Sequence, residues 1–89
     1  FAIVVLLSLH HRMASDDKIL LEAFSRTLRK ARGDAGLSQE ELAHRAGKSI
    51  RYISLLEGQK HNPSLATLKS LCAGLGITMT DFIREIERQ

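Results

Sequence analysis

The sequence QEELAHRAGKSIRYISLLE, residues 39–57, decides the fold of this chain of 89 residues. Ser38 precedes it, and Glu41 follows at the spacing of a capping box, in which each side chain bonds the other residue's backbone N–H. Apolar residues then recur at helical intervals, and Gly47 suits the left-handed conformation that commonly ends a helix. Ser49 can cap a second helix. The stretch therefore predicts two short helices joined by a tight turn.

The apolar residues indicate how these two helices cross. Leu42, Ala43 and Ala46 share one face of the first helix, and Ile53 and Leu56 share one face of the second. Ala43 is small enough for the crossing point of two steeply inclined helices, and Ile53 can fill the gap between them. This arrangement is typical of a helix-turn-helix unit.

Beyond this unit, the sequence resembles the Cro and phage-repressor type of helix-turn-helix domain, also called the xenobiotic-response-element family. The resemblance extends from about Phe24 to Ile83. It is carried by GLSQEELAHRAG at residues 36–47, YIS at 52–54 and NPSL at 62–65. It implies an all-α, five-helix, lambda-repressor-like domain that binds double-stranded DNA, usually as a homodimer on a two-fold symmetric operator.

Composition and charge fit one small domain with a polyanionic partner. The chain is 44% hydrophobic but only 4% aromatic, so the core is expected to be aliphatic. Residues 42–63 hold four basic residues against Glu57 alone, which accounts for the whole net charge of +3. Positive charge gathered in this way is the footprint of a phosphate-facing surface. The single Cys72 suits a reducing compartment, and we expect a cytoplasmic, nucleoid-associated protein.

The first residues do not continue the pattern. The apolar run of residues 1–9 is too short to span a bilayer, and it lacks the basic start and small-residue exit of a secretory signal. We expect residues 1–15 to be an extension added by cloning or upstream translation, followed by the DNA-binding domain at 16–89. The alternative is a genuine arm in which residues 1–12 pack against the domain or a second chain.

Helical spacing also predicts a long helix before the unit. It should run from about Asp16 or Asp17, whose charges suit its positive end, to Arg32 or a little beyond. Its solvated side carries Arg26, Arg29 and Lys30. Its apolar face consists of Leu20, Leu21, Phe24, Leu28 and Ala31.

Two further helices follow the unit. Pro63 ends a loop, Ser64 caps the next helix and Gly76 stops it. The buried face of that helix is expected to hold Leu65, Leu68, Leu71, Cys72 and Leu75. Thr78 and Asp81 have the spacing of another capping box, and a short amphipathic helix follows them.

The second helix of the unit is expected to lie in the major groove, with its N-terminal half toward the base edges. Arg51 is the strongest candidate, because a guanidinium can bond two guanine acceptors, worth about 1–3 kcal/mol of discrimination. Ile50 or Leu55 can meet a thymine methyl group. Helical spacing and the resemblance together nominate five base-contacting residues, Ser49, Ile50, Arg51, Ser54 and Leu55.

The resemblance implies further roles. It suggests an ion pair between Arg32 and Glu57, which would tie the long helix to the reading helix. The family also commonly has Glu-x-Gly where this chain has Glu57-Gly58-Gln59. With Lys48 as a nearby cation, the expected phosphate contacts are Gln39, Lys48, Tyr52, Lys60, Asn62 and Ser64. The last helix has a spare apolar edge; it either caps the core or, as often in this family, forms a dimer contact through Met79, Phe82, Ile83 and Ile86.

No catalytic, metal or cofactor site is predicted. The histidines lack Cys partners at metal-ligand spacing, and neither a Gly-rich phosphate loop nor a nucleophile–base–acid set is evident. We therefore expect no enzyme, no small-molecule substrate and no membrane partner. The leading function is a transcriptional repressor or controller. The apolar Ile50 and Leu55 keep open an alternative, a protein-binding adaptor or antitoxin that uses the same fold without reading bases.

Overall fold

The computed structural model describes the backbone of residues 2–89 and the side chains of residues 17–89. Its helices are α1 (Ala2–Asp34), α2 (Gln39–Ala46), α3 (Ile50–Glu57), α4 (Leu65–Leu75) and α5 (Met79–Glu87), and the described residues contain no strand. The expected all-α, five-helix fold is confirmed. Within the described part of the chain, none of the helices combines the length and apolar character that crossing a bilayer requires.

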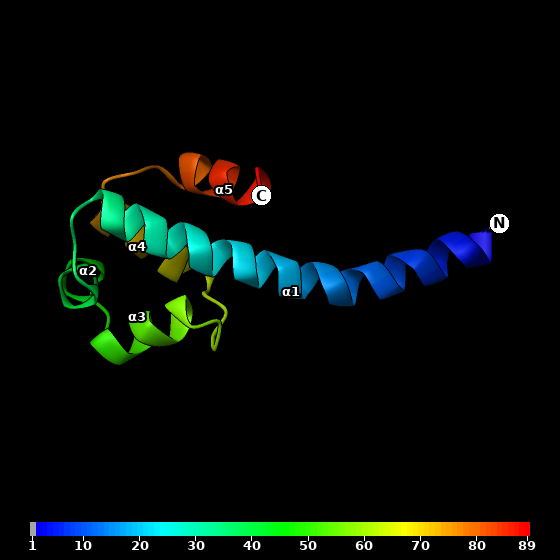
Figure 1. Ribbon diagram of the computed structural model, residues 1–89, viewed down its shortest axis with the longest axis horizontal. Helices are drawn as coiled ribbons and strands as arrows, with labels where there is room; N and C mark the ends of the chain where they lie inside the picture. The colour runs from blue at the N-terminus through cyan, green and yellow to red at the C-terminus, as the bar shows by residue number, and fades with distance from the viewer. Residues whose placement is uncertain (1) are drawn as a thin grey trace.

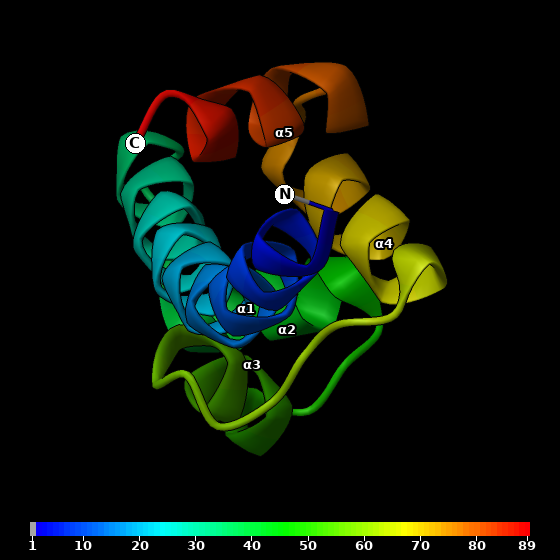
Figure 2. The same ribbon diagram turned by 90° about the vertical axis from the view of Figure 1, so that its right-hand side faces the viewer.

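The four shorter helices gather around the C-terminal half of α1 (Figure 1). Figure 2 shows α5 and α3 on opposite sides of α1, with α4 to one side. α1 contacts both α3 and α5, while α2 packs against α3 and α4. α3 therefore lies at the edge of the molecule, with one face on its neighbours and the other open.

The start of α1 was predicted wrongly. The helix begins at Ala2, well before Asp16 or Asp17, and it ends at Asp34. Residues 2–32 contain neither Gly nor Pro, so nothing in the sequence interrupts a helix there. Its first turn carries no acidic residue, so the two aspartates do not serve its positive end. The predicted packing of residues 1–12 against the domain or a second chain lies outside the described side chains.

The core is aliphatic, as predicted, with one aromatic pair. Leu28, Leu42 and Leu56 are wholly buried, each from a different helix. Phe24 of α1 and Phe82 of α5 meet edge to face, with ring centroids 5.8 Å apart and an interplanar angle of 62°. The residues predicted at the crossing of α2 and α3 are also buried, namely Leu42, Ala43, Ala46, Ile53 and Leu56. Cys72 is buried as well, as predicted.

Two residues predicted for buried faces are exposed. Leu20 is 57% exposed and Leu65 is 77% exposed. Leu65 is the first residue of α4, directly after the cap at Ser64, and the helix reaches the core only with Thr67 and Leu68. Helical spacing places a residue on a face, but it does not show how far along the helix that face is covered.

The capping signals were predicted more accurately. Ser64 caps α4, and Gly76 ends it in the left-handed conformation at φ 72°. Thr78 accepts a hydrogen bond from the Asp81 N–H at 3.0 Å, but the predicted capping box is only half formed. The Asp81 carboxylate accepts from Arg84 Nη1 at 3.3 Å, because this cation lies one turn along the same helix.

Candidate nucleic-acid interface

The turn between α2 and α3 follows the sequence closely. Ser38 Oγ accepts from the Glu41 N–H at 3.0 Å, and Glu41 Oε1 accepts from the Ser38 N–H at 2.9 Å, which completes the predicted capping box. Gly47 ends α2 in the left-handed conformation at φ 67°. Ser49 Oγ then accepts from the Tyr52 N–H at 3.1 Å and caps α3. Both ends of the turn are therefore held by local hydrogen bonds.

The C-terminal end of α3 is bonded to α1 by three side chains. Ser25 Oγ donates to the Leu56 carbonyl oxygen at 2.8 Å, and Arg29 Nη1 donates to the Glu57 carbonyl oxygen at 3.2 Å. Ser25 was not nominated from the sequence, and Arg29, predicted on the solvated side, is exposed and also reaches α3. Their positions relative to Arg32, at steps of four and three residues, place all three on one stripe of α1, and that spacing was the available signal.

The predicted ion pair between Arg32 and Glu57 is present. Arg32 donates from Nε to Oε2 at 2.6 Å and from Nη2 to Oε1 at 3.0 Å, a two-point contact with the carboxylate. The Glu57 side chain is 4% exposed and that of Arg32 is 22% exposed. Hydrogen bonding to Glu57 raises the pKa of Arg32 above its usual value. Arg32 Nη1 also donates to the Leu37 carbonyl oxygen at 2.9 Å, so one guanidinium joins α1, the segment before α2 and the end of α3.

Gln39 has a contact that was not predicted. Its Nε2 donates to Glu57 Oε1 at 3.1 Å, so its side chain completes the set of donors around the buried carboxylate. The Glu41 N–H is bonded to Ser38 Oγ, and the N–H groups of Gln39 and Glu40 have no partner within the helix. Gln39 was expected to contact phosphate, and in this structure its amide is occupied by Glu57 instead.

The outer face of α3 presents the residues nominated as base contacts. Ser49, Ile50, Arg51 and Ser54 are exposed, while Leu55 is half-buried. Ile50 is 48% exposed, so its apolar side chain is available on this face. Ile53 and Leu56, on the opposite face, are wholly buried. The structure thus brings the five nominated residues to one side of α3, with Leu55 at its margin.

Most of the residues nominated as phosphate contacts come from the turn before α3, from α3 itself, and from the loop that follows it. Lys48 and Tyr52 are half-buried, and Lys48 Nζ lies 5.9 Å from the centroid of the Tyr52 ring. Lys60, Asn62 and Ser64 are exposed in and after the loop that follows α3. Ser64 is also the cap of α4, because its Oγ accepts from the Thr67 N–H at 3.1 Å.

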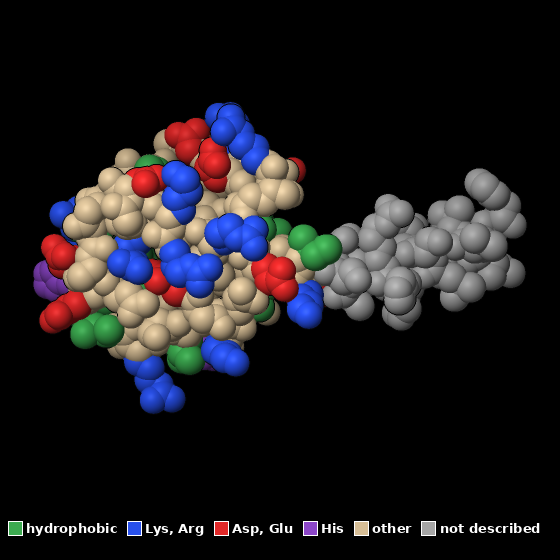
Figure 3. Space-filling view, viewed as in Figure 1, with side chains coloured by type: hydrophobic (Ala, Val, Ile, Leu, Met, Phe, Trp, Pro, Cys, Tyr) green, Lys and Arg blue, Asp and Glu red, His purple; other side chains and the backbone are tan. Residues whose placement is uncertain are grey.

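The pairing of Glu57 changes the charge of this surface. Glu57 is the one acid of residues 42–63, and it is buried against Arg32. The charges that this stretch exposes are therefore all positive, namely those of Arg45, Lys48, Arg51 and Lys60. Figure 3 shows Lys and Arg side chains projecting at the lower edge of the molecule, where α3 lies in Figure 1, with hydrophobic side chains beside them.

The turn after α3 differs from the usual Glu-x-Gly arrangement in a specific way. Gly58 has φ −93°, and the left-handed residue is Gln59, at φ 62°. Gln59 thus adopts the conformation that a glycine adopts more easily. A glycine is favoured at position 58 for a different reason, because a Cβ atom there would lie only 3.2 Å from the Ser54 carbonyl oxygen.

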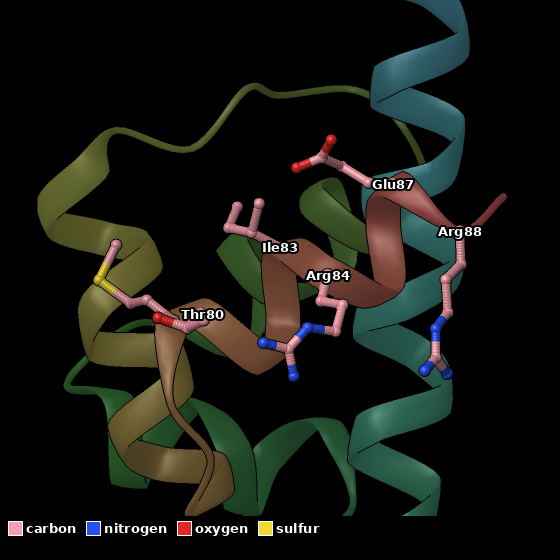
Figure 4. A pocket seen from close by; sticks show the side chains of 6 residues that line it. Thr80, Ile83, Arg84, Glu87 and Arg88 are labelled. Atoms are coloured by element: carbon pink, nitrogen blue, oxygen red, sulfur yellow. The ribbon is translucent and has the colours of Figure 1, made fainter.

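The predicted dimer contacts on α5 need a correction. Phe82 is 1% exposed and Ile86 is 7% exposed, and both belong to the core, so their side chains are not available to a second chain. Ile83 is 37% exposed and Met79 is half-buried. Figure 4 shows Ile83 and Glu87 pointing to the same side of α5, within a shallow hollow lined by Met79, Thr80, Ile83, Arg84, Glu87 and Arg88.

Comparison with known proteins gives a consistent result. A family profile described as helix-turn-helix matches residues 28–82. The chain is 37% identical over 75 residues to the control protein C.MunI of Mycoplasma sp, covering 84% of this chain and 99% of that protein. It is 42% identical over 60 residues to the HTH-type transcriptional regulator DdrOP3 of Deinococcus deserti, covering 67% of this chain. That match spans 46% of DdrOP3, less than half of its length.

A solved structure agrees with these sequence matches. The wild-type restriction-modification controller protein C.Esp1396I superimposes with a TM-score of 0.74 at 28% identity, over 78% of this chain and 91% of that chain. The profile covers more than half of the chain, and it includes α2, the turn and α3. The chain therefore belongs to the helix-turn-helix family, of the Cro and phage-repressor type expected from its sequence.

Proposed function

We propose that this protein is a sequence-specific double-stranded DNA-binding transcriptional regulator, of the repressor or controller type, that acts as a homodimer on a two-fold symmetric operator. The observation that carries the proposal is the outer face of α3, where polar and apolar side chains are exposed and every exposed charge is positive. The similarity to a transcriptional regulator, DdrOP3, and to a control protein, C.MunI, supports the same proposal. The proposed role needs no catalysis and no cofactor.

The proposed mode of binding follows from the position of α3. Its dimensions fit the major groove of B-DNA, and its N-terminal half would approach the base edges. Arg51 would donate two hydrogen bonds to a guanine, Ser49 and Ser54 would bond base edges or phosphates, and Ile50 and Leu55 would contact thymine methyl groups. The burial of Ile53 and Leu56 supports this orientation, because it fixes which side of α3 faces outward.

Affinity would come from the flanking residues. Lys48, Tyr52 and Lys60, with Asn62 and Ser64, would hold the sugar–phosphate backbone on either side of the groove. Gln39 would contribute mainly through the backbone N–H groups at the start of α2, since its amide bonds Glu57. These contacts carry little sequence information, and their contribution falls steeply with salt.

Dimerisation is proposed to use the outer side of α5. Met79 and Ile83 offer the apolar contact, and Phe82 and Ile86 support them from the core. Two α3 helices related by a two-fold axis would then meet successive turns of the major groove. The division into an extension at residues 1–15 and a domain at 16–89 remains our proposal, as does location at the nucleoid in the cytoplasm.

Selection of bound sequences from a random duplex pool tests this function. A two-fold symmetric consensus is expected, with a G·C pair in each half-site for Arg51. Arg51→Ala should weaken binding to that consensus by roughly 5- to 150-fold and leave weak non-specific binding largely intact. Arg26→Ala is the charge-matched control, because Arg26 bonds Gln89 on the α5 side of α1. Equal loss of specific and non-specific binding in Arg51→Ala would reject the base-reading role.

One observation favours a second candidate. Ile50 is 48% exposed at the N-terminal end of the reading face, as it would be in an adaptor or antitoxin that binds a protein there. Titration against random duplex at several salt concentrations separates the two functions. A DNA-binding regulator loses affinity steeply as salt rises. Binding that is absent at low salt, or insensitive to salt, would favour the adaptor.

A further inference from the structure

The two segments that flank α3 each place one side chain near the same aromatic ring, that of Tyr52. Lys48 belongs to the turn before α3, and His61 belongs to the loop after it. Lys48 Nζ lies 5.9 Å from the centroid of the Tyr52 ring. The His61 ring centroid lies 5.9 Å from the same ring, at an interplanar angle of 36°. His61, which the sequence did not nominate, thus joins two predicted phosphate contacts, Lys48 and Tyr52, in one cluster at the edge of the proposed interface.

Tyr52 is the fixed member of this cluster. It is half-buried against the hydrophobic core, and its N–H donates to the Ser49 cap at 3.1 Å. His61 is exposed, in a segment between α3 and α4 that has no regular secondary structure. A ring that packs onto an anchored tyrosine restricts such a loop. The contact therefore gives the middle of the loop a defined position on α3.

The neighbours of His61 are the residues that this contact would place. The Lys60 N–H donates to the Leu55 carbonyl oxygen at 2.8 Å, which holds the start of the loop. Pro63 is half-buried and restricts the backbone at the other end. Between these points, the peptide group that joins Lys60 to His61 and the backbone of Asn62 depend on where His61 lies. Lys60 and Asn62 are both proposed phosphate contacts.

We infer that His61 is a positioning residue of the DNA interface, which packs on Tyr52 and so holds Lys60 and Asn62 against the sugar–phosphate backbone. The inference rests on the proposed function and adds a residue to it. A loop that is already held in position loses less conformational freedom on binding. The contact between His61 and Tyr52 therefore strengthens DNA binding even though His61 does not contact DNA.

The test compares His61→Ala, which removes the ring, with His61→Phe, which keeps a ring but lacks imidazole nitrogens. The probe is a short random-sequence duplex, titrated at several salt concentrations. His61→Ala should weaken binding roughly 2- to 12-fold, the cost of ordering one loop side chain, and His61→Phe should restore the wild-type affinity. If both variants weaken binding equally, His61 contacts phosphate directly and the inference is wrong.

A second measurement excludes a merely structural effect. Lys60→Ala should lower affinity and reduce the salt slope by about one in the wild-type background. The same change should have a smaller effect when His61 is Ala and its full effect when His61 is Phe. An equal effect of Lys60→Ala in all three backgrounds would overturn the inference. A melting temperature for His61→Ala equal to wild type would show that the loss arises in the interface and not in the fold.

The two proposals fail differently. If the wild-type protein binds no duplex even at low salt, both the proposed function and this inference are wrong. If the wild-type protein binds duplex and His61→Ala binds equally well, the proposed function stands and only the positioning role of His61 is lost.

Discussion

Replacing Arg32 with Ala should destabilise the domain more than any other single loss of charge on α1. The change removes two hydrogen bonds to the Glu57 carboxylate, at 2.6 and 3.0 Å, and a third to the Leu37 carbonyl oxygen at 2.9 Å. The carboxylate that remains is 4% exposed, and the Gln39 amide is its remaining side-chain donor among the described residues. A buried charge is thus left largely without compensation.

The magnitude follows from that burial. Removing one partner of a buried ion pair costs about 3–5 kcal/mol. Because the Arg32 side chain is 22% exposed, water can reach the gap that it leaves, and we expect about 3–4 kcal/mol for Arg32→Ala. Glu57→Ala should cost less, about 2–3 kcal/mol, since the guanidinium left behind keeps the Leu37 carbonyl and can turn toward solvent. For a domain of this size, about 3 kcal/mol lowers Tm by at least about 12 °C.

Urea denaturation at neutral pH, followed by circular dichroism, measures these differences. Lys30→Ala is the control, because Lys30 pairs with Asp34 at 2.8 Å but both side chains are largely exposed, at 73% and 67%. That pair should contribute nothing measurable. The double variant Arg32→Ala/Glu57→Ala should be less destabilised than the two single changes added together.

Two results would refute the reasoning. If Arg32→Ala and Lys30→Ala have equal effects, the burial of Glu57 does not govern the energetics of this contact. If Glu57→Ala costs clearly more than Arg32→Ala, the uncompensated group is the guanidinium and not the carboxylate.

Three further predictions concern local structure. Gln59→Gly should stabilise the domain by about 0.5–1 kcal/mol by relieving the left-handed conformation, and no gain in urea denaturation would contradict this. Ala43→Leu should cost about 1–3 kcal/mol by overpacking the 2%-exposed helix crossing, and an unchanged Tm would place the crossing elsewhere. The hydrogen bond from the Ser38 N–H holds the pKa of Glu41 below 4.5, so this contribution to stability is present above pH 4.5 and is lost as pH falls. Glu41→Gln should therefore flatten the acid-side loss of stability, and an identical pH profile would exclude the capping box as its source.

The features predicted accurately from the sequence depend on near neighbours. The capping box of Ser38 and Glu41, the left-handed Gly47 and the cap at Ser49 each involve groups within a few residues of one another. Helix geometry fixes those distances, so the spacing in the sequence is almost the spacing in space. The crossing of α2 and α3 followed for the same reason, since only a short turn separates them.

Predictions failed where a distant segment decides the outcome. Phe82 looked like part of a spare edge on α5, but Phe24 of α1 covers it. Leu20 and Leu65 have the spacing of buried residues, yet both are largely exposed. The half-formed box at Thr78 has a nearer cause, because Arg84 takes the carboxylate of Asp81. The periodicity of apolar residues identifies the apolar face of a helix, but it does not show which other helix packs against that face.

The candidate site shows the same division. The exposed side of α3 could be assigned from spacing alone, whereas the partners of Glu57 could not. Arg32 was identified through the family resemblance, and Gln39 was given a different role. The regular spacing of Ser25, Arg29 and Arg32 was present in the sequence. Only the packing of α1 against α3 shows that these three side chains bond the end of α3.

The hydrogen bonds from three side chains of α1 to the end of α3 have a mechanical consequence. The C-terminal end of α3 is hydrogen-bonded to Ser25, Arg29 and Arg32 of α1, so α3 cannot rotate relative to α1 without breaking these bonds. In the proposed complex, the angle between α3 and the DNA axis is therefore fixed by contacts inside each protomer. Adjustment to operators whose halves are spaced or twisted differently falls to the joint between subunits, or to bending of the duplex itself.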